Sequence, residues 1–239
     1  MSGDMKAVNS QAETSTLLPP SLSLPQVKIC GLKRVDEALV CAGLGANAIG
    51  CVFYPRSPRH VTDEEARDIC KNLPHGVSGV GVLVNESFAT IMGKVERCGL
   101  KAVQLHGHES PDLVERLVRE GVTVIKALFV NGAPALADAQ SYRPSAFLVE
   151  CAGGPLPGGN AMAWDWSAAS GLSEKHPVIL AGGLNPGNVA DALRAASPDA
   201  VDVSSGVEAS PGRKDLDKVK FFLEAVFRTG CARETRSVF

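Results

Sequence analysis

Eight short apolar runs rich in β-branched residues recur along the chain after residue 26. Their first residues lie 21 to 31 positions apart, which is the period expected when each strand is followed by a helix and a return loop. The runs are nearly continuous in apolar residues, as is typical of a buried parallel sheet. They occupy 27–31, 48–53, 78–84, 102–107, 123–130, 146–151, 177–182 and 200–204. The sequence therefore predicts an α/β fold, a single (β/α)₈ TIM barrel.

Helical patterns with recognisable ends lie between several of these runs. A capping box begins at Thr62, with its acid at Glu65, and glycines follow two of the other helical segments. We expect helices over 36–41, from 62, over 111–118, over 188–196 and over 216–227. An open doubly wound sheet is the competing fold. It would carry a glycine-rich fingerprint directly after its first strand, and residues 30–34 (CGLKR) are not one.

The chain of 239 residues is predicted to form one large domain with short flanking segments. Residues 1–26 are rich in Ser, Thr, Pro and Gln and are expected to form a flexible N-terminal leader. The barrel is expected to span 27–230, and 231–239 to form a C-terminal tail. Residues 153–166 are too rich in Gly and Pro for regular structure, and we expect a long functional loop there.

Composition excludes several classes of protein. The formal net charge of −2 shows no basic excess of the kind that binds nucleic acid or a membrane surface. No apolar run approaches the roughly 18 residues that a membrane span needs. The seven cysteines are odd in number and contain no CxxC pair, which indicates a reducing compartment, so we expect a cytoplasmic protein with no metal site.

The first apolar run ends in a candidate base. Lys28 and Cys30 point to the same face of a strand because side chains alternate. A neighbouring cation favours the thiolate, the basic form of cysteine. Gly31 would let the backbone turn away and leave room beside the sulfur. A buried, inert cysteine is the alternative interpretation.

The last two runs end in turns suited to an anion. Gly182-Gly183 and Ser204-Ser205-Gly206 are small-residue turns, each before a predicted helix, whose backbone N–H groups can approach a phosphate closely. The loops after strands 7 and 8 of a barrel are a frequent phosphate site. Arg59 sits in a loop stiffened by Pro55 and Pro58 and suits a carboxylate through paired hydrogen bonds. A solvated surface arginine is the alternative for this residue.

A reaction with a base also needs an acid, and the remaining strand ends offer candidates. Glu150, near the end of the sixth run, is the first candidate, with Asp202 in the eighth run as a second. His106 could also transfer protons, or could simply be hydrogen-bonded in its loop. Gln104 and Lys126 complete the polar residues that we expect at this end of the barrel.

With these pieces assembled, residues 27–228 resemble the phosphoribosylanthranilate isomerase family of tryptophan biosynthesis. Five motifs match in order, and five matches in register are a strong signal. They are KICGL at 28–32, GCVFYPRSPR at 50–59, VQLHG at 103–107, AGGLNP at 181–186 and VDVSSGVE at 201–208.

The resemblance implies a rearrangement that needs no cofactor, in which N-(5-phosphoribosyl)anthranilate becomes 1-(2-carboxyphenylamino)-1-deoxyribulose 5-phosphate. It implies that Cys30 is the base and Glu150 the acid, and that Arg59 holds the anthranilate carboxylate. Gly182, Gly183, Ser204, Ser205 and Gly206 would hold the phosphate, while Lys28, Gln104, His106 and Asp202 would line the substrate. The partner is then a small phosphosugar, and both a monomer and a homodimer remain open.

The sixth run departs from the family pattern. The family usually has aspartate where this chain has Glu150, and lysine where it has Met162. The extra methylene would move the carboxyl by roughly 1.5 Å. Two alternatives therefore stay open: a catalytically silent phosphosugar-binding relative, and another phosphosugar barrel enzyme. Indole-glycerol-phosphate synthase would need lysines that are not matched here, and the histidine-pathway isomerase would need aspartate in place of Cys30.

Overall fold

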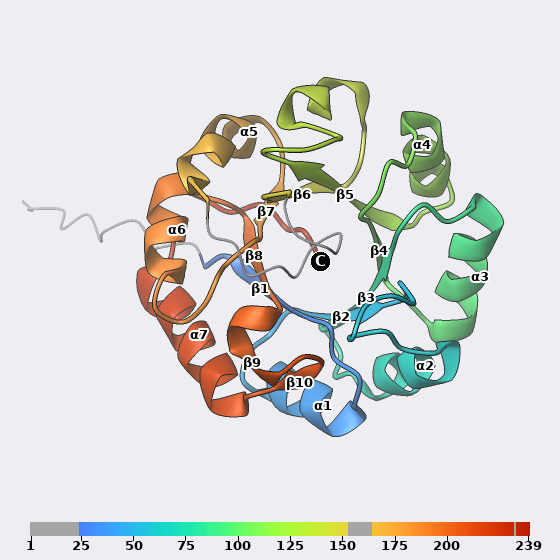
Figure 1. The fold of residues 1–239 in the computed structure, drawn as a ribbon, viewed down its shortest axis with the longest axis horizontal. Coiled ribbons are helices and arrows are strands. Elements are labelled where there is room, and N and C mark those ends of the chain that lie inside the picture. The colour runs from blue at the N-terminus through green and yellow to red at the C-terminus, as the bar shows by residue number, and fades with distance from the viewer. Residues whose placement is uncertain (1–23, 153–163, 232) are drawn as a thin grey trace, which may run out of the picture.

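A closed barrel of eight parallel strands in sequential order forms the centre of the protein (Figure 1). The computed structural model describes residues 24–152, 164–231 and 233–239. The strands are β1 (Gln26–Cys30), β2 (Ala48–Val52), β3 (Ser78–Leu83), β4 (Ala102–Leu105), β5 (Thr123–Phe129), β6 (Ala146–Glu150), β7 (Val178–Leu180) and β8 (Ala200–Val203). Strand β1 pairs with both β2 and β8, which closes the ring. The predicted fold is confirmed.

Helices surround the barrel, and their ends follow the sequence signals. They are α1 (Val35–Gly43), α2 (Asp63–Asn72), α3 (Phe88–Cys98), α4 (Pro111–Arg119), α5 (Ser170–Lys175), α6 (Val189–Ala196) and α7 (Leu216–Thr229). The predicted capping box is present, since the Thr62 side chain accepts from the Glu65 N–H and the Glu65 carboxylate accepts from the Thr62 N–H. Helix α3 was not predicted from the sequence, although Ser87 caps its start and Gly99 takes a left-handed conformation at its end.

The connection between β5 and β6 lacks an α-helix. It contains the 3₁₀ helix η1 (Leu136–Ser141), and a second one, η2 (Trp166–Ala169), precedes the short α5. After β8 the chain forms the 3₁₀ helix η3 (Ser205–Val207) and a two-stranded hairpin of β9 (Glu208–Ser210) and β10 (Arg213–Lys214). This hairpin lies beside the barrel near α1 (Figure 1). The repeat is therefore regular in its strands and irregular in its helices.

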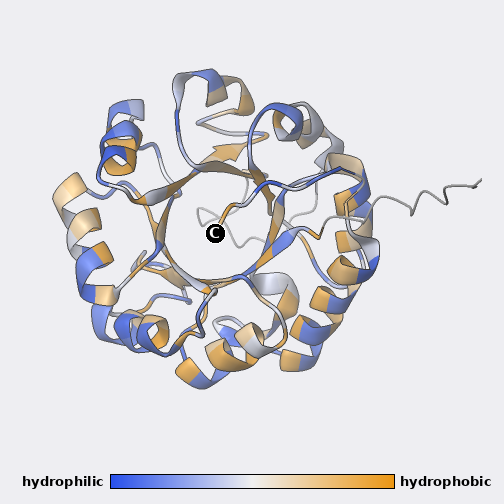
Figure 2. Ribbon diagram, turned by 180° about the vertical axis from the view of Figure 1, so that it is seen from behind, coloured by the Kyte–Doolittle hydropathy of each residue, from blue (hydrophilic) through white to orange (hydrophobic). Residues whose placement is uncertain are grey.

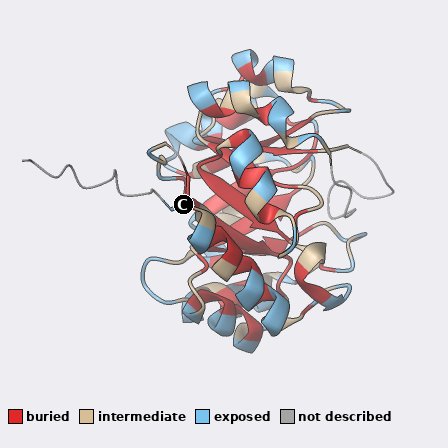
Figure 3. Ribbon diagram, turned by 90° about the vertical axis from the view of Figure 1, so that its left-hand side faces the viewer, coloured by how far each residue is buried: buried red, intermediate tan, exposed pale blue. Residues whose placement is uncertain are grey.

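The strands are buried and the outer sides of the helices are exposed (Figure 3), with apolar residues along the strands (Figure 2). The buried apolar side chains form two main layers. The larger lies between the strands and the helices and contains Val27 and Ile29 of β1. The smaller fills the barrel interior and contains Ile125, Ala127 and Phe129 of β5. Because strand side chains alternate, Lys126 points outward, and the expectation that it contributes to the barrel mouth is wrong.

Lys126 has a structural role instead. Its ammonium donates to the carbonyls of Leu105 and Gly107 and pairs with the Glu109 carboxylate at 2.8 Å. Glu109 in turn accepts from the N–H groups of Asn85 and Gly107. This buried ion pair fixes the loop after β4, which carries His106.

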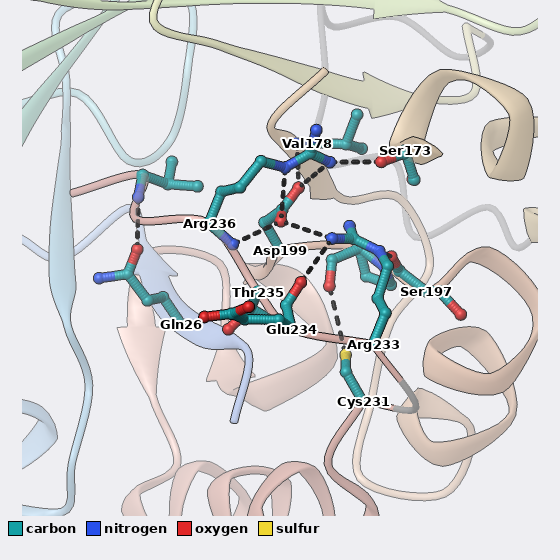
Figure 4. A network of polar contacts seen from close by, with 12 residues as sticks. Gln26, Ser173, Val178, Ser197, Asp199, Cys231, Arg233, Glu234, Thr235 and Arg236 are labelled. Carbon is teal, nitrogen blue, oxygen red and sulfur yellow. Dashed lines mark hydrogen bonds and ion pairs between the residues drawn. The ribbon is translucent and has the colours of Figure 1, made fainter. Parts of the chain in front are cut away.

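The chain after α7 crosses the amino-terminal end of the barrel, where the C mark lies over the centre of the ring in Figures 1 and 2. Val238 belongs to the apolar cluster inside the barrel, and its N–H donates to Gln26 Oε1 at 2.6 Å. Arg233 and Arg236 both pair with the fully buried Asp199, as Figure 4 shows. The described residues of the segment 231–239, predicted as a tail, thus pack against the end of the barrel opposite the strand carboxyl ends.

Candidate active site

Cys30 lies at the carboxyl end of β1 with Lys28 below it on the same face. Both side chains are buried. The Lys28 ammonium donates to Asp202 Oδ1 of β8 at 2.9 Å, and it also interacts with the Cys30 thiol. Lys28 and Cys30 thus lie on one face of β1, both beside Gly50, and Asp202 belongs to the same group.

Burial and charge act in opposite directions on this thiol. Burial raises the pKa of Cys30 above its usual value, and the lowering effect of the Lys28 and Lys214 ammonium groups only partly offsets it. Burial also acts to lower the pKa of Lys28, but Asp202 and Cys30 outweigh it, so the net shift is upward. Lys28 is thus held as a cation, while Cys30 is a thiol that needs more than this cation to ionise.

Gly50 makes room for the sulfur. It is paired with Cys30 across β1 and β2, and a Cβ added at position 50 would lie 2.7 Å from Cys30 Sγ and 3.0 Å from Cys30 Cα. Cys30 Cα is part of the β1 backbone, so it cannot shift without disturbing the strand. Only glycine therefore leaves the thiol where it is.

We expect Gly50→Ala to lower kcat by roughly 10- to 100-fold because it displaces the sulfur, and a displacement of about 1 Å can cost this much. Steady-state kinetics would measure the change. The matched control is Gly43→Ala in α1, where an added Cβ meets nothing within 4 Å. Parent-like kcat in Gly50→Ala would contradict this requirement for space.

Arg59 is buried beside Gly31 and is not a solvated surface residue. Its side chain fills the space that Gly31 leaves, since a Cβ at position 31 would lie 2.5 Å from Arg59 Cδ. The Nε and Nη2 atoms each donate to Glu208 at 2.8 Å, which is a two-point ion pair. Among the described residues no hydrogen bond is made by Nη1, so this edge of the guanidinium is open to another acceptor.

Glu208 joins Arg59 to the β9–β10 hairpin. Its carboxylate also pairs with Lys214 at 3.0 Å, and Lys214 donates to the Ser204 carbonyl. Burial acts to raise the pKa of Glu208, but the Arg59 hydrogen bond and the Lys214 charge outweigh it and hold the value below its usual range. No role was predicted for Glu208 or Lys214 from the sequence, because this ion-pair group forms only when the hairpin folds back towards the loop after β2.

The turns after β7 and β8 lie against each other. Gly182 and Gly183 both adopt left-handed conformations, with φ of 84° and 68°. Their N–H groups donate to no acceptor within the described ranges. A Cβ at Gly206 would collide with the Leu184 carbonyl at 1.9 Å. Glycine at position 206 therefore allows the two predicted phosphate turns to meet, with Ser204 anchored by its hydroxyl to the Cys30 carbonyl at 3.1 Å.

Glu150 ends β6 and contacts His106. His106 Nε2 lies 3.0 Å from Glu150 Oε1, and Gln104 Nε2 lies 2.9 Å from His106 Nδ1. All three side chains are buried. The His106 ring also meets the edge of Phe129, with centroids 5.5 Å apart. Each of these polar residues was predicted at the barrel mouth, but their mutual contacts join separate strands and leave no local sequence pattern.

The loop that follows β6 falls largely outside the described residues, which begin again at Trp164. Met162 is one of the residues not described. Trp164 donates its indole N–H to the Ala181 carbonyl at 3.0 Å. The returning chain is thus anchored beside the Gly182 turn by a residue to which sequence analysis assigned no role.

No cluster of three or more His, Cys, Asp or Glu side chains among the described residues could hold a metal ion. In the same part of the chain, no helix is long and apolar enough to cross a membrane.

Comparison with known proteins gives one consistent family. The model of the N-(5'-phosphoribosyl)anthranilate (PRA) isomerase family matches residues 27–225. An N-(5'-phosphoribosyl)anthranilate isomerase from Desulfatibacillum aliphaticivorans is 54% identical over 214 residues, which cover 90% of this chain and 98% of that relative.

Solved structures agree with this family. Monomers generated from the dimeric isomerase of Thermotoga maritima are 38% identical, with a TM-score of 0.76, over 86% of this chain and 100% of that one. A phosphoribosyl anthranilate isomerase solved in complex with reduced 1-(o-carboxyphenylamino)-1-deoxyribulose 5-phosphate is 39% identical, also with a TM-score of 0.76 and the same coverage.

Proposed function

Because this chain belongs to the N-(5'-phosphoribosyl)anthranilate isomerase family, we propose that it converts N-(5-phosphoribosyl)anthranilate into 1-(2-carboxyphenylamino)-1-deoxyribulose 5-phosphate. The observation that carries this proposal is the grouping at one end of the barrel. The substrate has one reacting carbon, one carboxylate and one phosphate. This end of the barrel offers a buried thiol for the carbon and a guanidinium with one open edge for the carboxylate. It also offers, for the phosphate, two glycine N–H groups that have no acceptor among the described residues.

The two anionic ends of the substrate would be held by different elements. Arg59 Nη1 would bind the anthranilate carboxylate, while Glu208 keeps the rest of the guanidinium in place. The N–H groups of Gly182, Gly183 and the turn at 204–206 would bind the phosphate. Two fixed anchors hold the ribose between Cys30 and Glu150.

The chemistry then needs one acid and one base. Glu150 would protonate the ribose ring oxygen as the bond between that oxygen and C1 breaks, which leaves a protonated Schiff base. Cys30, as thiolate, would remove the proton from C2. The electron pair of the broken C2–H bond then forms the C1–C2 double bond of the enolamine. Tautomerisation of the enolamine gives the ketone product. Lys28 favours the thiolate against the opposing effect of burial.

Asp202 is the weaker candidate for the acid. Its Oδ1 already accepts from the Lys28 ammonium at 2.9 Å. A carboxyl group that pairs with a cation is a poor proton donor. We assign Asp202 instead to holding Lys28 beside the thiol.

Turnover of freshly generated phosphoribosylanthranilate tests the proposed function. The fluorescence of this compound should decrease when the purified protein is added, because the enzyme converts it into product. Absence of turnover, with a product analogue still bound, would show a phosphosugar-binding relative instead of an isomerase.

We further propose a cytoplasmic enzyme that is a monomer or a homodimer. The seven cysteines are all free thiols, which fits a reducing compartment. The relative from Thermotoga maritima is dimeric. Sedimentation of the full chain would decide between the two states.

A further inference from the structure

Lys214 of the β9–β10 hairpin connects the residues that are proposed to hold the two anionic groups of the substrate. Its side chain is fully buried, and its ammonium donates to Glu208 Oε1 at 3.0 Å and to the Ser204 carbonyl at 3.1 Å. Glu208 holds Arg59, the proposed ligand of the carboxylate. Ser204 begins the turn at 204–206, which is proposed to bind the phosphate. One cation therefore contacts the supports of both binding groups.

The first effect of Lys214 is on charge. Glu208 fixes the Arg59 guanidinium by two hydrogen bonds of 2.8 Å, but its negative charge also offsets the positive charge that would attract the carboxylate of the substrate. Burial acts to raise the pKa of Glu208, but Arg59 and Lys214 outweigh it and keep this group ionised. With Lys214 present, two cations face one anion. One positive charge is thus in excess beside the open Nη1 atom of Arg59.

The other charged groups around the hairpin do not contact the Glu208 carboxylate. Glu37 accepts from the backbone N–H of Lys214 at 3.3 Å, and Lys218 donates to the backbone carbonyl of Glu208 at 3.0 Å. Neither forms a hydrogen bond or ion pair with Arg59. In the part of the chain that the structure describes, Arg59 and Lys214 are therefore the cations paired with this carboxylate.

The second effect of Lys214 is on the direction of a peptide group. The C=O and the following N–H of a trans peptide point in opposite directions. Because the Ser204 carbonyl points to Lys214, the Ser205 N–H points away from it. The N–H groups of Ser205 and Gly206 donate to no acceptor among the described residues. Lys214 therefore holds this turn with its free Ser205 N–H directed away from the hairpin.

We propose that Lys214 is a positioning residue that serves both anionic groups of the substrate without contacting either. Its charge offsets that of Glu208 beside Arg59, and its hydrogen bond orients the turn at 204–206 towards the phosphate. This inference rests on the proposed function, in which Arg59 binds the carboxylate and this turn binds the phosphate.

Binding of a substrate analogue tests this role without turnover. Lys214→Met keeps the length of the side chain but removes the ammonium. We expect the Kd of reduced 1-(o-carboxyphenylamino)-1-deoxyribulose 5-phosphate, measured by calorimetry, to rise by about 100-fold, roughly 10-fold from each anionic group. Lys218→Met is the matched control. It removes a half-exposed cation that donates to the Glu208 carbonyl and not to the carboxylate, so Kd should stay within about 2-fold.

A second substitution separates the effect on charge from a general loss of structure. Lys214→Met combined with Glu208→Gln removes an anion together with the cation, so one positive charge is again in excess at Arg59. The new amide can still accept one hydrogen bond from the guanidinium. We expect this double variant to bind the analogue about 5- to 10-fold more tightly than Lys214→Met. A purely structural role predicts weaker binding instead, because Arg59 also loses one of its hydrogen bonds to position 208.

Inorganic phosphate, as a competitor of the analogue, reports on the turn alone. Its binding should weaken by about 10-fold in Lys214→Met and by the same factor in the double variant, since both lack the hydrogen bond to the Ser204 carbonyl. Unchanged competition in Lys214→Met would overturn the role at the turn.

The remaining outcomes separate this inference from the proposed function. A double variant that binds the analogue no more tightly than Lys214→Met would overturn the role in charge. A parent protein that does not bind the analogue would overturn the proposed function and this inference with it. A parent protein that binds the analogue without turning over substrate would overturn the isomerase reaction alone, and the expected order of Kd values would still support the role of Lys214.

Discussion

Replacing Cys30 with alanine is expected to lower kcat on the order of 1,000-fold, because it removes the base that takes the C2 proton, and a positioned base contributes roughly 100- to 10,000-fold. Cys30→Ser keeps the approximate size of the side chain, but a hydroxyl is a far weaker acid than a thiol and does not ionise to act as the base. We therefore expect kcat to fall by nearly as much. Fluorescence-based turnover would measure both, with KM expected to change little because Arg59 and the glycine turns remain.

The matched comparison lies on the acid side of the reaction. Glu150→Gln keeps the shape of the side chain but has no proton to give, so we expect a loss of similar scale. Asp202→Asn should lose less, because Asp202 acts through Lys28. Near-full activity in Glu150→Gln together with loss in Asp202→Asn would assign the acid to Asp202 and contradict the proposed mechanism.

The second large effect is on stability and lies at the other end of the barrel. Asp199 is fully buried, accepts from the Val178 and Arg236 N–H groups, and pairs with the Arg233 and Arg236 guanidiniums (Figure 4). Asp199→Asn removes the charge and turns an NH₂ group towards these donors. We expect the free energy of unfolding to fall by about 3 kcal/mol, less than for a fully buried pair because both arginines are partly exposed.

Urea unfolding would measure this loss, and the melting temperature should fall by roughly 10 °C. Asp191→Asn is the matched control. Asp191 pairs with Arg194 on the surface of α6, and exposed pairs of this kind contribute less than about 1 kcal/mol. Equal effects of the two substitutions would show that the segment after α7 does not stabilise the barrel.

The contribution of Asp199 should also depend on pH. Burial acts to raise the pKa of Asp199, but hydrogen bonds from Arg233 and Arg236 outweigh it and hold the value below its usual range. A carboxyl group with a lowered pKa stabilises the fold above its unfolded-state pKa of about 3.9 and loses this contribution as the pH falls through the folded value. The difference in stability between the parent and Asp199→Asn should therefore be constant near neutral pH and shrink below about pH 4.

Sequence alone determined the barrel and the end at which chemistry-bearing residues gather. The period of the apolar runs gives a parallel α/β repeat, and strand alternation places Lys28 with Cys30, as found. Capping residues gave the start of α2. The predicted family is confirmed. It could be predicted because its five motifs are short stretches of consecutive residues, which are visible in the sequence without the fold. The roles assigned to individual site residues remain predictions.

Tertiary structure decided which of these residues meet. Lys126 points out of the barrel because Ile125 and Ala127 point in, a register that a uniformly apolar run does not reveal. Arg59 and Glu208 are 149 positions apart and form an ion pair through the hairpin after β8. Glu150 at the end of β6 contacts His106 after β4, although β5 lies between these strands. Residues 233–239 pack against the amino-terminal end of the barrel, where Arg233 and Arg236 pair with Asp199. Each of these contacts joins distant segments, so its geometry depends on closure of the whole barrel and not on any local pattern.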